Sequence, residues 1–173
     1  MASPERRRLA GTWLRHARTD RSPLATPADH ADGRWQRGRV IGGFYLAESE
    51  DTVRAEWYRY LAEWGIPPLK ADLRHLWRFD VDIEVADLST AERLAEHGLA
   101  LPTPDSLTWA PYQDVGEQLF REGWDGLVAP SAARPAGEVL CLFWRRPELG
   151  GVRAVPPPDR WEEPPVPPRG MTT

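Results

Sequence analysis

A carboxylate at position 56 is the first side chain in the sequence whose surroundings suggest chemistry. Apolar residues at helical spacing predict a buried stripe made of Val53, Trp57, Tyr60 and Trp64. Glu56 falls at the rim of this stripe, whereas Arg59 is expected to face outward. A carboxylate beside a buried aromatic face is either a site residue or half of an ion pair. Spacing alone favours the ion pair, because nearly buried charges are usually paired.

Two arginines are candidates for binding an anion. Arg34 lies in the sequence Gly33-Arg34-Trp35, in a predicted loop before a strand. Its guanidinium matches phosphate oxygens two at a time, although a loop arginine is usually solvated. Arg15 lies within a short predicted strand. We expect it to point into a cleft or to pair with an acid.

Tyr45 and Ser131 are the remaining candidates. Tyr45 lies near the end of a predicted strand, where an aromatic residue is most often core but can also stack on a flat ring. Ser131 follows Pro130 directly after an apolar strand, so its hydroxyl could cap a turn or contact a ligand. The turn is the commoner role. No Gly-x-Ser-x-Gly pattern surrounds Ser131, which argues against a nucleophile elbow.

Several classes of protein are excluded. The four histidines are widely spaced and form no metal-binding pattern with Cys141, and no phosphate-binding glycine motif is present. The mean hydropathy is −0.54, and no apolar run is long enough for a transmembrane helix. Cys141 is the only cysteine, so no internal disulfide can form and the cytoplasm is the expected location.

The charge of the chain is unevenly distributed. The formal net charge is −4, which argues against a general nucleic-acid binder. Residues 1–40 nevertheless contain nine arginines against four acidic residues, so the rest of the chain carries −9. A basic segment on an acidic chain favours a site for one small anion over a long polyanion track. For Arg6, Arg7 and Arg8 we expect ordinary solvated surface.

The coarse pattern predicts an α+β fold, with a small mixed or antiparallel β core and flanking helices. Strands are expected at 12–17, 40–47, 77–85, 126–129 and 138–144, and helices at 49–64, 89–98 and 114–121. Ser49 is the expected N-cap of the first helix, and a capping box from Ser89 to Glu92 begins the second. We expect an N-terminal arm at 1–10, a folded domain at 11–154 and a passive Pro-rich tail at 155–173.

These motifs occur in an order that resembles the RES domain family, named for characteristic Arg, Glu and Ser residues. The matching stretches are Trp13-Leu14-Arg15, Gly33-Arg34-Trp35, Phe44-Tyr45-Leu46-Ala47-Glu48-Ser49, Arg54-Ala55-Glu56, and residues 123–132 around Ser131. The similarity runs from about residue 12 to 145. Two positions depart from the family pattern: Gln36 and the region of Glu138 stand where asparagine is common.

The resemblance implies NAD degradation by the toxin of a bacterial toxin–antitoxin pair, on a fold similar to that of ADP-ribosylating toxins. Glu56 would then stabilise the ribose cation that forms as nicotinamide leaves, and hold the ribose hydroxyls. Tyr45 would stack on nicotinamide, Arg34 with Arg15 would grip the pyrophosphate, and Ser131 would contact the substrate or orient Glu56. No metal or cofactor is expected beyond NAD as substrate, with inorganic phosphate as a candidate co-substrate.

Three functions remain open from the sequence. The first is an NAD phosphorylase or NAD glycohydrolase. The second is an ADP-ribosyltransferase that modifies a protein or nucleic acid, and the third is a non-enzymatic binding module in which the departures at Gln36 and Glu138 reflect lost activity. The expected partners are NAD and a cognate antitoxin protein, without a membrane or direct nucleic-acid contact. The oligomeric state, a homo-oligomer included, is left open.

Overall fold

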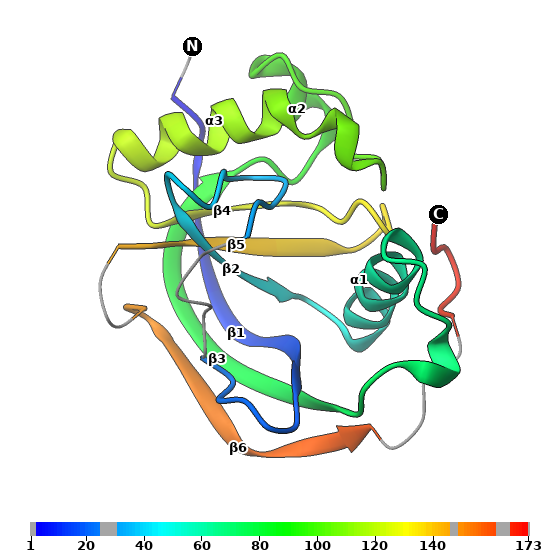
Figure 1. Cartoon of the computed structure of the whole chain (residues 1–173). Coiled ribbons are helices and arrows are strands. Elements are labelled where there is room, and N and C mark those ends of the chain that lie inside the picture. The colour runs from blue at the N-terminus through cyan, green and yellow to red at the C-terminus, as the bar shows by residue number, and fades with distance from the viewer. Residues whose placement is uncertain (1–2, 25–30, 146–148, 162–166, 173) are drawn as a thin grey trace.

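The chain folds around one strongly curved sheet of six strands, seen in the computed structural model (Figure 1). The structure describes residues 3–24, 31–145, 149–161 and 167–172. The strands are β1 (Arg6–Arg18), β2 (Gly42–Ala47), β3 (Arg74–Asp87), β4 (Gly126–Pro130), β5 (Glu138–Trp144) and β6 (Val152–Trp161). The α-helices are α1 (Glu50–Glu63), α2 (Ala91–Glu96) and α3 (Ala110–Arg121), and short 3₁₀ turns cover Pro68–Lys70 and Ser106–Thr108. This arrangement confirms the predicted α+β class.

The sheet closes on itself because β1 pairs on both of its edges. The strand order is β1-β2-β5-β4-β3-β6, and β1 also pairs with β3. Every residue of β1 has a partner on β3, from Arg6 opposite Ala86 to Arg18 opposite Arg74. On its other edge, β1 pairs with β2 at one position only, Leu14 opposite Ala47. The ring of strands is therefore tightly joined on one side of β1 and weakly joined on the other.

Apolar side chains fill three places around this sheet. The first cluster, which includes Phe44 and Phe79, lies between β1, β2, β3 and β5. A second cluster joins the sheet to α2 and α3, which lie together above it in Figure 1. The third, which includes Trp57 and Trp161, packs α1 against β1, β3 and β6. The alternation predicted for β3 is confirmed, because Phe79 is buried while Asp80 is exposed.

The two ends of the folded region differ from the predicted boundaries. The predicted arm at 1–10 contains the first five residues of β1, which form a strand because they pair with β3. The predicted tail contains most of β6. Its prolines are tolerated because β6 is an edge strand, and they lie where the pairing register shifts between Leu76 and Arg78. Of the predicted tail, residues 162–166 and 173 lie outside the described residues.

The helix boundaries follow from their caps. Ser49 caps α1 as predicted, and its Oγ accepts a hydrogen bond from the Thr52 amide at 3.3 Å. The predicted cap of α2 was wrong by one residue: Thr90 is the N-cap, whereas the Ser89 hydroxyl donates to Asp87 Oδ1 at 2.6 Å. Helix α3 begins four residues earlier than predicted, because Pro111 is compatible with a first helical turn.

Candidate functional site

A cavity of about 1240 Å³ opens beside the weakly joined edge of β1. Its walls come from the last residues of β1 and β2, the inner side of α1, and the loop before β2. Four of the five predicted site residues line this cavity: Arg15, Arg34, Tyr45 and Glu56. The fold therefore brings together residues from β1, a loop, β2 and α1.

Both carboxylate oxygens of Glu56 are held in place. The Ser131 hydroxyl donates to Oε1 at 2.7 Å, and Arg59 Nε donates to Oε2 at 3.0 Å. The Glu56 side chain remains 26% exposed at the cavity wall. The sequence offered Glu56 either as a site residue or as half of an ion pair. Both descriptions apply, because Glu56 is an ion-pair partner that also faces the cavity.

Ser131 acts from behind the cavity wall. It is 1% exposed, and it is not among the residues that line the cavity. Its Oγ accepts from the amides of Ala133 at 3.2 Å and Arg134 at 3.1 Å while its hydroxyl donates to Glu56. Ser131 therefore caps the turn after β4 and fixes the Glu56 carboxylate through that turn.

Arg34 is a buried cation without a carboxylate partner among the described residues. Its side chain donates to the Thr103 carbonyl, while Nη1 has no hydrogen-bond partner in the described part of the chain. The guanidinium carbon lies 5.2 Å from the centre of the Tyr112 ring. Burial, and then the positive charge of Arg59, lowers the pKa of Arg34 below its usual range. An unpaired buried charge is costly, so this guanidinium is well suited to bind an anion.

Tyr45 is fixed by the turn that carries Arg34. Its hydroxyl donates to Gln36 Oε1 and accepts from the Trp35 amide at 3.2 Å. Burial is the main cause that raises the pKa of Tyr45 well above its ordinary value, so the phenol stays neutral. The buried Gln36 side chain fills the space over Gly33 and Gly43, where a Cβ atom would come within 2.7 Å and 2.6 Å of it. Gln36 therefore supports the Tyr45 hydroxyl.

Arg15 points into the cleft, which was one of its two predicted outcomes. Its guanidinium carbon lies 4.1 Å from the centre of the Phe44 ring. Burial lowers the pKa of Arg15 to about 10, which leaves it charged at neutral pH. Nη1 is buried and has no hydrogen-bond partner among the described residues. Arg15 is thus a second cation turned toward the cavity without a carboxylate beside it.

The comparisons with known proteins agree with this geometry. A family model for the RES domain matches residues 6–164. The chain belongs to the RES domain family. The matched range extends beyond the predicted 11–154 at both ends and includes all of β1 and β6.

The fold of this RES domain is also found among solved structures. A chain in the crystal structure of the M. tuberculosis MbcT–MbcA toxin–antitoxin complex superposes with a TM-score of 0.72. It is 24% identical, and the match covers 86% of this chain and 83% of the other. A comparison with curated proteins gave no match. The resemblance inferred from the sequence motifs is confirmed at the level of family and fold.

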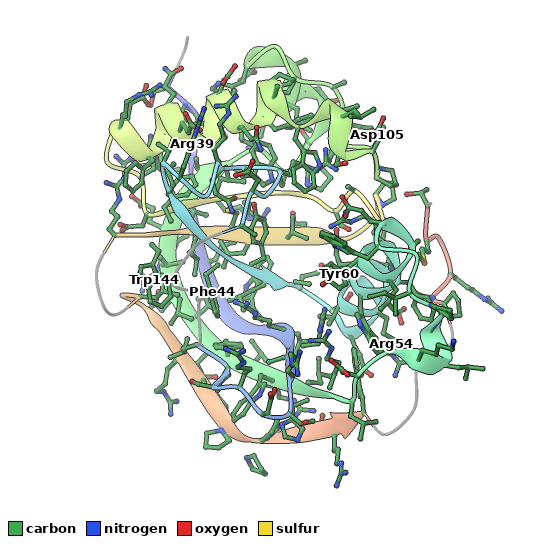
Figure 2. The ribbon with its side chains drawn as sticks, in the orientation of Figure 1. Arg39, Phe44, Arg54, Tyr60, Asp105 and Trp144 are labelled. Carbon is green, nitrogen blue, oxygen red and sulfur yellow. The ribbon has the colours of Figure 1, made fainter. Side chains whose placement is uncertain are left out.

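The RES domain contains cavity residues that the sequence analysis placed wrongly. Arg59 was expected to face outward, but it lines the cavity and bridges Glu56 and Glu63, with Nη1 3.0 Å from Glu63 Oε2. Its spacing of three residues from Glu56 was a usable signal. Tyr60 and Trp64 were expected to be buried, yet they are 42% and 67% exposed and line the cavity. Figure 2 shows Tyr60 on the side of α1 turned toward the middle of the molecule.

Glu138 has a structural role and does not line the cavity, although its neighbour Val139 does. Arg7 donates to both Glu138 carboxylate oxygens, at 2.7 Å and 3.0 Å. This half-buried pair corrects the expectation that Arg7 is ordinary solvated surface. The Glu138 amide donates to Glu48 Oε2 at 2.8 Å, which ties the start of β5 to the end of β2. Glu138 therefore supports the turn that holds Ser131 without lining the cavity.

Two further features of the RES domain concern metals and membranes. Within the described residues, no cluster of three or more His, Cys, Asp and Glu side chains could hold a metal ion. His30 lies outside the described residues. None of the helices in the described part of the chain is long and apolar enough to span a membrane.

Proposed function

We propose that this RES domain cleaves the nicotinamide–ribose bond of NAD in the cytoplasm, as the toxin of a toxin–antitoxin pair. The observation that carries the proposal is the Glu56 carboxylate, which is fixed by Ser131 and Arg59 at the wall of a cavity that also exposes unpaired arginines. A held carboxylate suits a developing cation, and unpaired guanidinium groups suit phosphate. NAD contains both chemical groups in one molecule.

The reaction breaks the bond between C1′ of the ribose and the pyridinium nitrogen. The bonding electron pair leaves with nicotinamide, which becomes neutral, and positive charge develops on the ribose. The Glu56 carboxylate stabilises that charge by electrostatic attraction, as in glycoside cleavage. Each carboxylate oxygen has more than one lone pair, so Glu56 can also accept hydrogen bonds from the ribose hydroxyls while keeping its bonds to Ser131 and Arg59.

The acceptor completes the reaction by forming a new bond to C1′. An oxygen of water or of inorganic phosphate supplies the electron pair, and the water proton leaves to solvent. We propose these two acceptors as alternatives, with NAD as the substrate and no further cofactor. Arg34 and Arg15 would bind the pyrophosphate, and the Tyr45 ring would stack on nicotinamide.

A cognate antitoxin is proposed as the protein partner. The structural relative comes from a complex of that kind, and the family match supports the comparison. The cavity rim of this chain also exposes apolar side chains. Leu69 and Leu107 are 91% and 90% exposed, and each adjoins a residue that lines the cavity. These side chains would be covered by an antitoxin that sits over the cavity.

Nicotinamide release from NAD tests the enzymatic proposal. Purified protein is incubated with NAD with and without phosphate, and free nicotinamide is quantified by chromatography. Glu56→Gln is expected to lower the rate by about 10²–10³-fold, because it removes the charge that faces the ribose cation. Glu63→Gln is the matched control, since Glu63 pairs with the same Arg59 but makes no contact with Ser131.

Each result has a distinct meaning. Cleavage that requires phosphate indicates a phosphorylase, and cleavage without phosphate indicates a glycohydrolase. Two results together would replace the proposal by ADP-ribosyltransfer. Labelled ADP-ribose would be transferred to a macromolecule, and no nicotinamide would be released when that macromolecule is left out. Folded protein that neither cleaves nor binds NAD would contradict both enzymatic functions and favour a binding module.

A further inference from the structure

The cavity has two groups of charged side chains at separate ends. At one end, the Arg34 guanidinium lies 5.2 Å from the Tyr112 ring of α3. At the other, Arg74 begins β3 and lies opposite Arg18, the last residue of β1. The two ends are therefore built from different elements of the fold.

Two arginines face each other across strands at this second end. Arg18 on β1 is directly opposite Arg74 on β3, and both line the cavity. Like charges directly opposite in a sheet are destabilising. Arg18 is compensated by Asp20, at 3.1 Å, and by Asp72, at 3.4 Å. This compensation leaves Arg74 as the cation without a bonded carboxylate.

Arg74 and its neighbour His16 have unsatisfied nitrogens. Arg74 Nε and His16 Nδ1 are buried without a hydrogen-bond partner among the described residues, and both side chains line the cavity. Burial lowers the pKa of Arg74 and, with the charges of Arg74 and Arg15, lowers that of His16 to about 3. His16 is thus neutral and adds no repulsion. Buried groups left unsatisfied are costly unless a ligand binds them.

The cavity as a whole carries more positive charge than NAD requires. Among the described residues that line it are seven basic and four acidic side chains, on a chain whose net charge is −4. Three of the arginines, Arg15, Arg34 and Arg74, form no ion pair with any described residue. The proposed function uses Arg15 and Arg34 for the two phosphates of NAD. Arg74 remains for another anionic group.

A single cavity relates the two ends. Glu56 and Arg74 both line it, and its volume is about 1240 Å³. A dinucleotide whose reacting ribose lies at Glu56 can therefore extend within the same cavity toward Arg74.

We propose that Arg74, together with Arg18, forms a second anion subsite that binds a phosphate on the adenosine ribose, so that the preferred substrate is a 2′-phosphorylated dinucleotide. The subsite rests on the proposed function, because that function assigns the other two arginines to the pyrophosphate. The phosphate would accept hydrogen bonds from Arg74 and relieve the repulsion between the two facing guanidinium groups. NADP is the ligand with this chemistry, and NAD lacks it.

Ligand fragments test the subsite without requiring catalysis. Calorimetry compares adenosine 2′,5′-bisphosphate with adenosine 5′-monophosphate on the wild type, Arg74→Gln, Arg74→Lys and Arg78→Gln. The wild type is expected to bind the bisphosphate about 10–100-fold more tightly, the range for charge-assisted hydrogen bonds. Arg74→Gln should lose most of this preference, and Arg74→Lys should keep part of it. Arg78→Gln should keep all of it, because Arg78 lies on the same strand, pairs with Asp159 and does not line the cavity.

Three results would overturn the subsite. The first is equal affinity of the wild type for the two fragments. The second is an equal loss of affinity for both fragments in folded Arg74→Gln, which would assign Arg74 to the 5′-phosphate that the fragments share. The third is Arg74-dependent binding of inorganic phosphate without any bisphosphate preference, which would indicate a site for the free anion.

Nicotinamide release from NAD and NADP separates this inference from the proposed function. A bisphosphate preference that depends on Arg74, in a protein that cleaves neither dinucleotide, would retain the subsite and contradict the enzymatic function. Cleavage of NAD and NADP with equal kcat/KM, and no bisphosphate preference, would retain the function and overturn the subsite. Both inferences are supported if NADP is cleaved with a higher kcat/KM and Arg74→Gln removes the difference.

Discussion

Two parts of β1 differ in how their arginines are paired. Near the start of the strand, Arg6 binds Glu84 at 2.6 Å and Arg8 binds Asp82 at 2.9 Å, and all four side chains are exposed. Further along, next to the single pairing with β2, Arg15 lines the cavity and has no carboxylate partner among the described residues. One strand thus carries arginines in two opposite electrostatic situations.

The difference shows that the role of an arginine is indicated by whether it has a carboxylate partner, and not by its presence alone. An exposed ion pair contributes little to stability, because water and salt screen it. A buried guanidinium without a carboxylate is costly to the folded protein, and a bound anion would offset that cost. This distinction separates the unpaired Arg15, Arg34 and Arg74 from the paired arginines on the surface of the sheet.

Among the arginines, the largest expected effect comes from removing one that lines the cavity. Arg34→Ala is expected to lower NAD cleavage by about 10²-fold or more, because an anchoring charge in a water-poor site is lost. Thermal unfolding should show a folded protein, since Arg34 has no carboxylate among the described residues that would be left unpaired. The control is Arg39→Ala in the same loop, where Arg39 is exposed. Wild-type cleavage rates in Arg34→Ala would refute its assignment to the site.

An intermediate effect is expected from pH at the second end of the cavity. The pKa of His16 is about 3 in the folded protein, mainly because of burial, and about 6.5 in an unfolded chain. Between these values the unfolded chain binds a proton that the folded protein does not. The free energy of unfolding should therefore fall as pH drops from about 6.5 toward 3, by about 1–3 kcal/mol from His16 alone at pH 4.5.

Urea unfolding of the wild type and His16→Gln at pH 7 and pH 4.5 measures this contribution. Carboxylates with lowered pKa values, such as Asp87, also weaken the protein in acid, and they do so equally in both proteins. The variant should therefore lose less stability than the wild type over this interval. Equal losses would show that His16 is protonated as readily in the folded protein as in the unfolded chain.

The smallest expected effect comes from the paired arginines near the start of β1. Arg8→Ala is expected to change the free energy of unfolding by no more than about 1 kcal/mol, since its ion pair with Asp82 is solvent-exposed. Nicotinamide release should be unchanged, because Arg8 does not line the cavity. Denaturant unfolding and the NAD assay together check this. A loss of activity comparable to that of Arg34→Ala would remove the contrast between paired and unpaired arginines.

Much of the site was predictable because its signals are local. The Ser49 cap fixed the start of α1, and that start set the position of Glu56 along the helix. The motif order around Arg34, Tyr45 and Ser131 indicated the RES family, which the family match confirms. Functional roles for these residues stay predictions until the variants are measured.

Other features could not be predicted from the sequence, because they depend on residues that are distant in the chain. The three prolines of β6 argue against a strand, and only its pairing with the outer edge of β3 makes that strand possible. Arg59 was predicted to face outward because the spacing of apolar residues along a helix shows only which side of that helix is apolar. It does not show that the neighbouring wall is an open cavity with Glu56 and Glu63 beside it.

The sequence by itself determined the family, the alternation of β3, the cap of α1 and the identity of four cavity residues, since each depends on neighbours within one element or motif. Only the tertiary structure decided which charges are paired. Arg7 meets Glu138 across 131 positions of sequence, while Arg74 meets another arginine across the sheet. Electrostatic energy depends on distance and burial in the folded protein, and neither can be obtained from residue order alone.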